Sequence, residues 1–194
     1  MAETLGPQTE LSAVNSMLLA IGEQSIASLT GTLPPDATTI LTILRDGSRD
    51  LQEEGWHFNT DYDVTIAIDG SGFIQLPTDA LRVDNEGQID TAWRDGRLYD
   101  RDDLTYVFTE ALDCTVVRHL AFDDIPPAAR RYITLLATIK VLRIFPYGSE
   151  SLLRLAQLDL RDAKAAFMQA EMDQGGYNAL TGSLTTSTIL RRGT

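Results

Sequence analysis

The chain has 194 residues, a hydrophobic fraction of 43% and a formal net charge of −12. This length favours one domain, or one domain with an insertion, and allows a sizeable core. The acidic charge argues against a dedicated nucleic-acid-binding protein, because neutralising phosphates needs clustered Lys and Arg. The single cysteine, Cys114, excludes an internal disulfide framework and a cysteine-rich metal site.

The sequence also limits where the protein is made. No apolar run approaches the roughly 18 residues that a membrane-spanning helix needs. Residues 1–10 lack the basic and then apolar pattern of a signal peptide. We therefore expect synthesis in the cytoplasm and no membrane anchor.

Two helices are predicted before residue 55, over residues 10–21 and 35–54. Pro34 and Pro35 suit the start of the second, and Asp36 is expected to cap it. A close approach by a neighbouring helix is one explanation for Gly47 inside it. The apolar residues at helical spacing are Leu11, Val14, Leu18 and Ile21 in the first helix, and Ile40, Leu44 and Leu51 in the second.

The pattern changes to strands between residues 57 and 122. Val64, Ile66 and Ile68 alternate with smaller or polar residues, which is the period of a half-buried strand. Asp95 and Gly96 lie between two short runs, 93–94 and 97–99, and this dipeptide is a strong hairpin signal. Residues 69–72 form a predicted turn, and further strands are expected over 73–76, 81–84 and 113–120.

Helices return after residue 122. Asp123 and Asp124 are expected to cap a helix that starts at the prolines 126 and 127. Ser149 is expected to cap a last helix, which should reach about Gly175. The apolar stripes are Ile133, Leu136, Ala137, Val141 and Ile144 in the first of these helices, and Leu153, Ala156, Leu160, Ala163 and Phe167 in the second.

The predicted fold class is therefore α+β. Residues 1–56 and 123–176 are expected to form an antiparallel α-helical bundle, because their apolar stripes can close on each other. Residues 57–122 form an inserted, small antiparallel β-rich region. Residues 177–194, rich in Ser and Thr, form an extended C-terminal tail.

Three segments, in this order along the chain, carry a resemblance to a known family. They are residues 11–23, residues 54–59 with Trp56 and Phe58, and residues 172–180, where Gly175 and Gly176 end a long helix. At these separations the chain resembles the tail tubular protein A family, the head-to-tail adaptors of short-tailed, T7-like bacteriophages. The resemblance runs from about residue 10 to residue 180.

The resemblance implies a structural protein of the virion tail, without catalytic activity or cofactors. Copies of the chain would form a dodecameric ring between the portal and the tail nozzle (tail tubular protein B) and support the attachment of tail fibres. The ring would continue the channel through which the genome leaves, and DNA would pass without specific binding. Solubility is the simpler explanation of the acidic charge. In a ring around DNA the alternative is an acidic lumen, which would repel phosphates and let the duplex slide.

Two alternatives remain. One is an enzyme, a glycan hydrolase that helps to penetrate the envelope, and the other is a generic regulatory or adaptor domain with no viral context. Glycan hydrolases need two carboxylates roughly 5–10 Å apart. The adjacent pairs Asp102–Asp103 and Asp123–Asp124 match this poorly, because successive side chains of a strand point to opposite faces. Cys114 and His119 would face opposite ways on one strand, which is poor geometry for a nucleophile and its base. His57 and His119 are the only histidines, and no zinc-ligand cluster is present.

The candidate interface residues are few, because basic residues scatter along the chain. Arg130 and Arg131 fit a solvated helix face, with pairing to acids of a neighbouring subunit as the alternative. Arg191 and Arg192 are candidates for docking the tail on an acidic partner surface. Tyr177 and Asn178, which begin the tail, complete the candidate interface.

Overall fold

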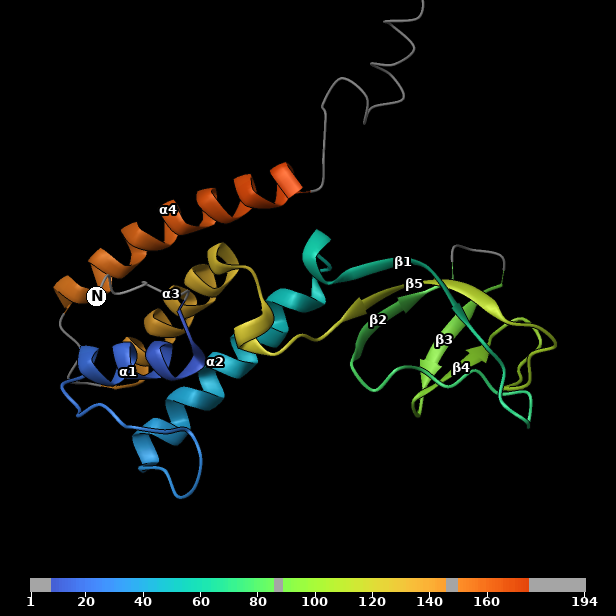
Figure 1. Cartoon of the computed structure of the whole chain (residues 1–194), viewed down its shortest axis with the longest axis horizontal. Helices are drawn as coiled ribbons and strands as arrows, with labels where there is room; N and C mark the ends of the chain where they lie inside the picture. Colours follow the sequence, from blue (N-terminus) through green and yellow to red (C-terminus); the bar gives the residue numbers. More distant parts are fainter. Residues whose placement is uncertain (1–7, 86–88, 146–149, 175–194) are drawn as a thin grey trace, which may run out of the picture.

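The computed structural model describes residues 8–85, 89–145 and 150–174. Within them, helices occupy both ends of the chain and strands the middle (Figure 1). This mixture of helices and small antiparallel sheets confirms the α+β class. None of the described helices is both long and apolar enough to cross a membrane. The elements are α1 (Glu10–Ala20), α2 (Pro35–Glu53), η1 (His57–Asn59), β1 (Thr60–Ile66), β2 (Ala80–Asp84), β3 (Thr91–Arg94), β4 (Arg97–Asp100), β5 (Leu112–Arg118), η2 (Phe122–Asp124), α3 (Pro127–Ile144) and α4 (Glu150–Gln174).

The helices pack around one hydrophobic core. α3 contacts α1, α2 and α4, and α1 also contacts α2. Each large apolar side chain that this core removes from water stabilises the fold by about 1.5–3 kcal/mol. The buried members include Val14 and Met17 of α1, Ile40 and Leu44 of α2, Ile133 and Val141 of α3, and Phe167 of α4.

The start of α1 follows from local hydrogen bonds. The Thr9 hydroxyl accepts from the Ser12 backbone N–H at 3.2 Å, and the Ser12 hydroxyl accepts from the Thr9 N–H at 2.9 Å. This reciprocal cap satisfies two donors that have no partner inside the helix. It explains why the predicted first helix begins at Glu10.

The predicted side-chain caps of the two proline-started helices are wrong. α2 and α3 have Pro34 and Pro126 at their N-caps, and neither start has a side-chain cap hydrogen bond. Proline at the first helical position removes an N–H that would need a partner, so these starts require less capping. Asp123 instead accepts a hydrogen bond from the Glu10 backbone N–H at 2.8 Å, and so serves α1.

The predicted apolar stripes of α3 and α4 are confirmed except at one residue. Ile144 is 59% exposed, because it is the last residue of α3 and extends past the packed part. In α4 all five predicted stripe residues are buried or half-buried. The Phe167 ring packs edge-on against Trp56, with centroids 4.6 Å apart, and is stacked on Tyr132 at 5.7 Å. The predicted cap at Ser149 lies outside the described residues.

The strands form a three-stranded antiparallel sheet, ordered β1-β5-β2, and the separate hairpin β3-β4. The predicted hairpin turn is confirmed: Asp95 and Gly96 have φ of 51° and 71°, as a type I′ turn requires. Asp69 and Phe73 close the predicted turn over residues 69–72. The first strand is shorter than predicted, because Ile68 lies beyond β1 and makes only an isolated bridge to Ile74.

Two amide side chains connect the helical and β parts. Gln52 of α2 is fully buried, and its amide donates to the Leu120 carbonyl (3.1 Å) and accepts from the Leu120 N–H (2.7 Å). Asn59 donates to the carbonyls of Gln52 and Arg118 at 2.9 and 2.8 Å. Figure 1 shows β1 and β5 leaving the helices at this junction.

The expected close approach of a neighbouring helix to Gly47 is wrong in this subunit. An added Cβ at Gly47 would meet no described atom within 4 Å.

Candidate functional site

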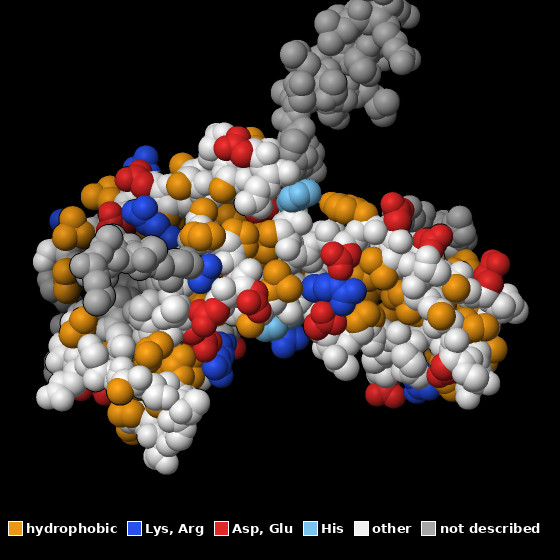
Figure 2. All heavy atoms as spheres, viewed as in Figure 1, with side chains coloured by type: hydrophobic (Ala, Val, Ile, Leu, Met, Phe, Trp, Pro, Cys, Tyr) orange, Lys and Arg blue, Asp and Glu red, His pale blue; other side chains and the backbone are white. Residues whose placement is uncertain are grey.

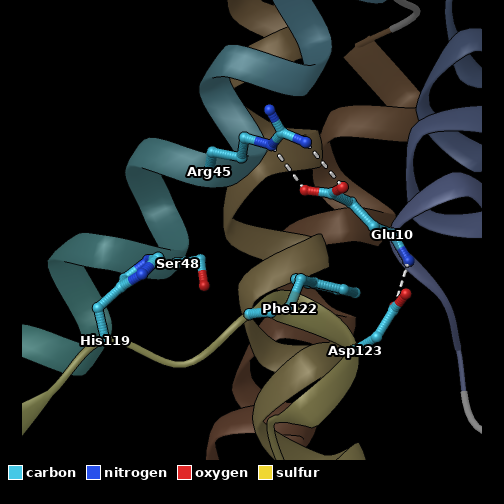
Figure 3. A pocket seen from close by; sticks show the side chains of 7 residues that line it. Glu10, Arg45, Ser48, His119, Phe122 and Asp123 are labelled. Atoms are coloured by element: carbon cyan, nitrogen blue, oxygen red, sulfur yellow. Dashed lines mark hydrogen bonds and ion pairs between the residues drawn. The ribbon is translucent and has the colours of Figure 1, made fainter. Parts of the chain in front are cut away.

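A hollow of about 380 Å³ lies where α1, α2 and the β5–α3 connection meet (Figure 3). Glu10, Arg45 and Ser48 come from the helices, and His119, Ala121, Phe122 and Asp123 come from the connection. It combines carboxylates, a serine and a histidine, so it is the first place to look for catalysis. The hydrogen bonds of these side chains show whether the hollow has a catalytic or a structural role.

The charged groups of this hollow hold the helices together. The Glu10 carboxylate accepts from Arg45 Nε at 2.8 Å and from Arg45 Nη2 at 3.0 Å. The hydrogen bond to Glu10 raises the pKa of the Arg45 guanidinium above its ordinary value. Because Asp123 accepts the Glu10 backbone N–H, both carboxylates bind groups of the protein itself (Figure 3). The pair of acids therefore joins α1 to α2 and to the segment before α3.

Ser48 and His119 do not form a catalytic pair. The Ser48 hydroxyl is buried and accepts from the Gln52 amide at 3.1 Å. His119 is exposed, and its backbone N–H donates to the Asp79 carbonyl. In the part of the chain that the structure describes, no hydrogen bond joins the two side chains. A nucleophile needs its base within hydrogen-bond reach.

The other sequence-predicted acids also have structural roles. Asp102 and Asp103 donate their backbone N–H groups to one oxygen of the buried Asp100 side chain, at 2.8 and 3.0 Å. Asp123 and Asp124 lie in η2. The hydrolase alternative gains no support from either pair. Cys114 is fully buried in the core of the β part. A nucleophilic thiol must be accessible to its substrate, so the burial of Cys114 does not fit a catalytic role.

No group of three or more metal-ligating side chains occurs among residues 8–85, 89–145 and 150–174. His57, in η1, is exposed, and its backbone N–H donates to Glu171. Trp56 and Phe58 pack against the helical core, as the sequence predicts. The side chains around the histidines are thus arranged for packing and hydrogen bonding.

The candidate interface residues separate into three groups. Arg131 is exposed on α3, next to Thr134, Thr138 and Asp159 in a shallow hollow. Arg130 is only 7% exposed, so the solvated-face interpretation is wrong for it. Its Nη1 donates to the Gln8 carbonyl at 2.8 Å, and its Nε has no partner among the described residues. Tyr177, Asn178, Arg191 and Arg192 lie outside the described residues.

The burial of Arg130 has a signal in the sequence that the prediction missed. Arg130 precedes Ile133, Ala137 and Val141 by three, seven and eleven positions. This spacing places it on the buried stripe of α3. Glu171 was missed for the same reason, since it follows Phe167 by four positions on the buried stripe of α4 and is only 8% exposed.

One ion cluster depends on distant parts of the chain. Arg118 of β5 donates to both oxygens of Asp79, at 2.9 and 3.0 Å, and its Nε pairs with Asp61 of β1. The hydrogen bonds to Asp61 and Asp79 raise the pKa of the Arg118 guanidinium. The cluster joins β1, β5 and the loop before β2, so its role is structural.

The polar side chains described above thus join helices, strands and loops to one another. Comparison with known proteins also indicates a structural protein. The family model described as "Tail tubular protein" matches residues 11–177. Tail tubular protein A of Klebsiella phage KP34 is 32% identical over 135 residues, which are 68% of this chain and 70% of that protein. This chain belongs to the tail tubular protein family.

Membership of the tail tubular protein family confirms the resemblance that three segments predicted. It makes the chain a structural component of a bacteriophage tail. The match includes both the helical part and the β part, so neither is foreign to the family.

Proposed function

We propose that this protein forms a dodecameric adaptor ring that connects the portal to the tail nozzle, lines the DNA ejection channel and supports tail fibres. The observation that carries the proposal is the family match over residues 11–177. A head-to-tail contact between identical subunits closes into a ring when its rotation is right. Each subunit then needs two different lateral surfaces and an axial one.

The helical part is the proposed body of the ring, with the four helices arranged as an antiparallel bundle. Figure 2 shows hydrophobic side chains exposed over α4, where a soluble monomer would carry polar ones. Contiguous exposed apolar side chains mark interaction surfaces. The exposed members on α4 are Leu152, Leu155, Leu158, Met168 and Met172. We assign much of the lateral contact to residues 35–54 and 129–174, with Arg131 pairing with acids of the next subunit.

The β part is the proposed contact for nozzle or fibres. Figure 1 shows it projecting from the helices, which leaves its far end accessible. The β part carries the exposed apolar residues Leu104 and Val107, and Trp93 is 44% exposed. The segment 177–194, with Tyr177, Asn178, Arg191 and Arg192, is proposed to reach a neighbouring subunit or the portal.

The charge of −12 suits a ring around DNA. Acidic groups on the channel wall would repel the phosphates, so the duplex would pass without specific binding. Mapping the charges of the assembled ring tests this part by itself. A channel wall that is basic or neutral, with the acids outside, would be evidence against it.

The mass of the purified full-length protein, alone and mixed with its portal, tests the proposal. We expect ring-sized particles, either alone or on portal addition, because portal-templated assembly gains from many weak contacts made together. The matched control is the portal with an unrelated acidic protein of similar size. A monomer in both conditions would overturn the proposal and reopen the hydrolase alternative.

A further inference from the structure

A second hollow lies where the end of α4 meets η1 and β1, and we call it the junction hollow. It has a volume of about 240 Å³ and is lined by Gly55, Trp56, His57, Tyr62, Met168, Glu171 and Met172. Its rim is apolar and open, since Tyr62, Met168 and Met172 are 60%, 39% and 49% exposed. Methionine and aromatic side chains of this kind are typical of surfaces that bind another segment.

Glu171 places a carboxylate inside this apolar rim. Its side chain is more than nine-tenths buried, and Oε2 accepts from the His57 backbone N–H at 2.8 Å. No cation pairs with it in the described ranges, although Arg82 lies against Gly55 close by. A buried carboxylate costs free energy unless a cation or several donors bind it. The junction hollow therefore suits a cationic side chain that follows apolar residues.

The chain itself contains a segment of this chemistry. Residues 175–194 have two arginines and no Asp, Glu, Lys or His, although the whole chain carries −12. The arginines, Arg191 and Arg192, come directly after Ile189 and Leu190. An apolar pair followed by a basic pair complements an apolar rim around an acid.

We propose that residues 189–192 of a neighbouring copy bind in the junction hollow. Ile189 and Leu190 cover Met168 and Met172, and one of the two arginines pairs with Glu171. This inference rests on the proposed ring, since a neighbour must lie within reach. An Arg guanidinium can donate two hydrogen bonds to one carboxylate, which makes the pair stronger than a neutral hydrogen bond.

The connecting segment is long enough to reach a neighbouring copy. The last described residue, Gln174, is two positions after Met172, which lines the junction hollow. Residues 175–188 reach roughly 45 Å when extended, at about 3.3 Å per residue. A compact chain of this size has a radius of gyration of roughly 16 Å, so that reach extends to the next subunit.

Cysteine cross-linking of full-length protein tests the contact. One variant carries Met172→Cys and another Leu190→Cys, and the two are mixed, assembled with the portal, checked for ring mass and mildly oxidised. Cys114 can remain, because it is fully buried. We expect a disulfide-linked dimer when the two variants are mixed, and none when either variant is assembled by itself. The control replaces Met172→Cys by Leu19→Cys, which is 63% exposed on α1 and lies outside both the junction hollow and the proposed lateral surface.

The other outcomes each overturn the inference. Rings of the expected mass without cross-links would refute it and leave the adaptor function standing. A cross-link that forms only within one chain, in a variant with both cysteines, would assign the hollow to the protein's own segment. Failure to form rings would instead count against the proposed function, because the mass is measured before oxidation.

Charge variants test the pairing itself. Glu171→Gln keeps an oxygen for the His57 N–H but removes the charge, and we expect cross-linking to need roughly tenfold more subunit. The double variant Arg191→Gln with Arg192→Gln should have the same effect, and combining all three changes should add nothing, because they remove one interaction. Additive losses, or unchanged cross-linking in Glu171→Gln, would overturn the assignment of Glu171.

Discussion

Phe167 is a buried aromatic contact between α4 and the rest of the fold. It is 1% exposed and packs against Trp56, Phe58 and Tyr132. Truncating a buried Phe to Ala costs about 3–5 kcal/mol in total, and this range already includes the roughly 0.5–1.5 kcal/mol that an aromatic pair contributes. We therefore expect Phe167→Ala to lower the free energy of unfolding by about 4 kcal/mol.

Urea unfolding, monitored by circular dichroism, measures this loss as a lower midpoint at an unchanged m-value. Each kcal/mol shifts the Tm of a chain this long by roughly 2–4 °C, so the Tm should fall by roughly 8–16 °C. Phe167→Leu, which keeps most of the volume, should lose only about 1–2 kcal/mol.

Leu158→Ala is the matched control, because Leu158 lies on the same helix and is 56% exposed. Its unfolding free energy should stay within about 0.5 kcal/mol of the parent chain. If Phe167→Ala loses less than about 1 kcal/mol, or no more than Leu158→Ala does, then α4 is not held by this aromatic contact and the reasoning is wrong.

Three further predictions concern single side chains. Gln52→Ala should lose about 2–4 kcal/mol in urea unfolding, because the half-buried N–H and carbonyl of Leu120 lose their partners. A loss below about 1 kcal/mol would contradict this. Gly47→Ala should raise the free energy of unfolding by about 0.5–1 kcal/mol, whereas Gly96→Ala should lower it by about 1–2 kcal/mol. Both sites have room for a Cβ, but only Gly96 has a positive φ. Equal effects of the two changes on the Tm would refute the conformational argument. The backbone N–H groups of Phe73 and then Ser71 lower the pKa of Asp69, so its contribution to stability is present above the ordinary carboxyl pKa and is lost as the pH falls through the lowered value. An NMR titration of the Asp69 carboxyl should show this lowered pKa, with Asp69→Asn as the control, and an ordinary pKa there would disprove the assignment.

The sequence by itself determined the elements whose causes are local. Periodicity of three and four predicted the buried faces of α1 and α4, and Asp95–Gly96 predicted the β3-β4 turn, because helical spacing and positive φ depend on neighbours in the chain. Three short segments in the right order also sufficed for the family, which the comparisons confirm. Arg130 shows a local signal that was present but overlooked, since basic residues are rarely buried.

Only the tertiary structure decided which polar groups meet. Asp123 was predicted to cap its own helix, but it accepts the Glu10 N–H, 113 positions away, and Gln52 binds Leu120 across 68 positions. The placement of Glu171 beside Met168, Met172 and Tyr62, which creates the junction hollow, joins the end of α4 to the start of the β part. Such contacts depend on how whole elements dock. Docking is fixed by the summed burial of many side chains, and no local pattern of a few residues contains that sum.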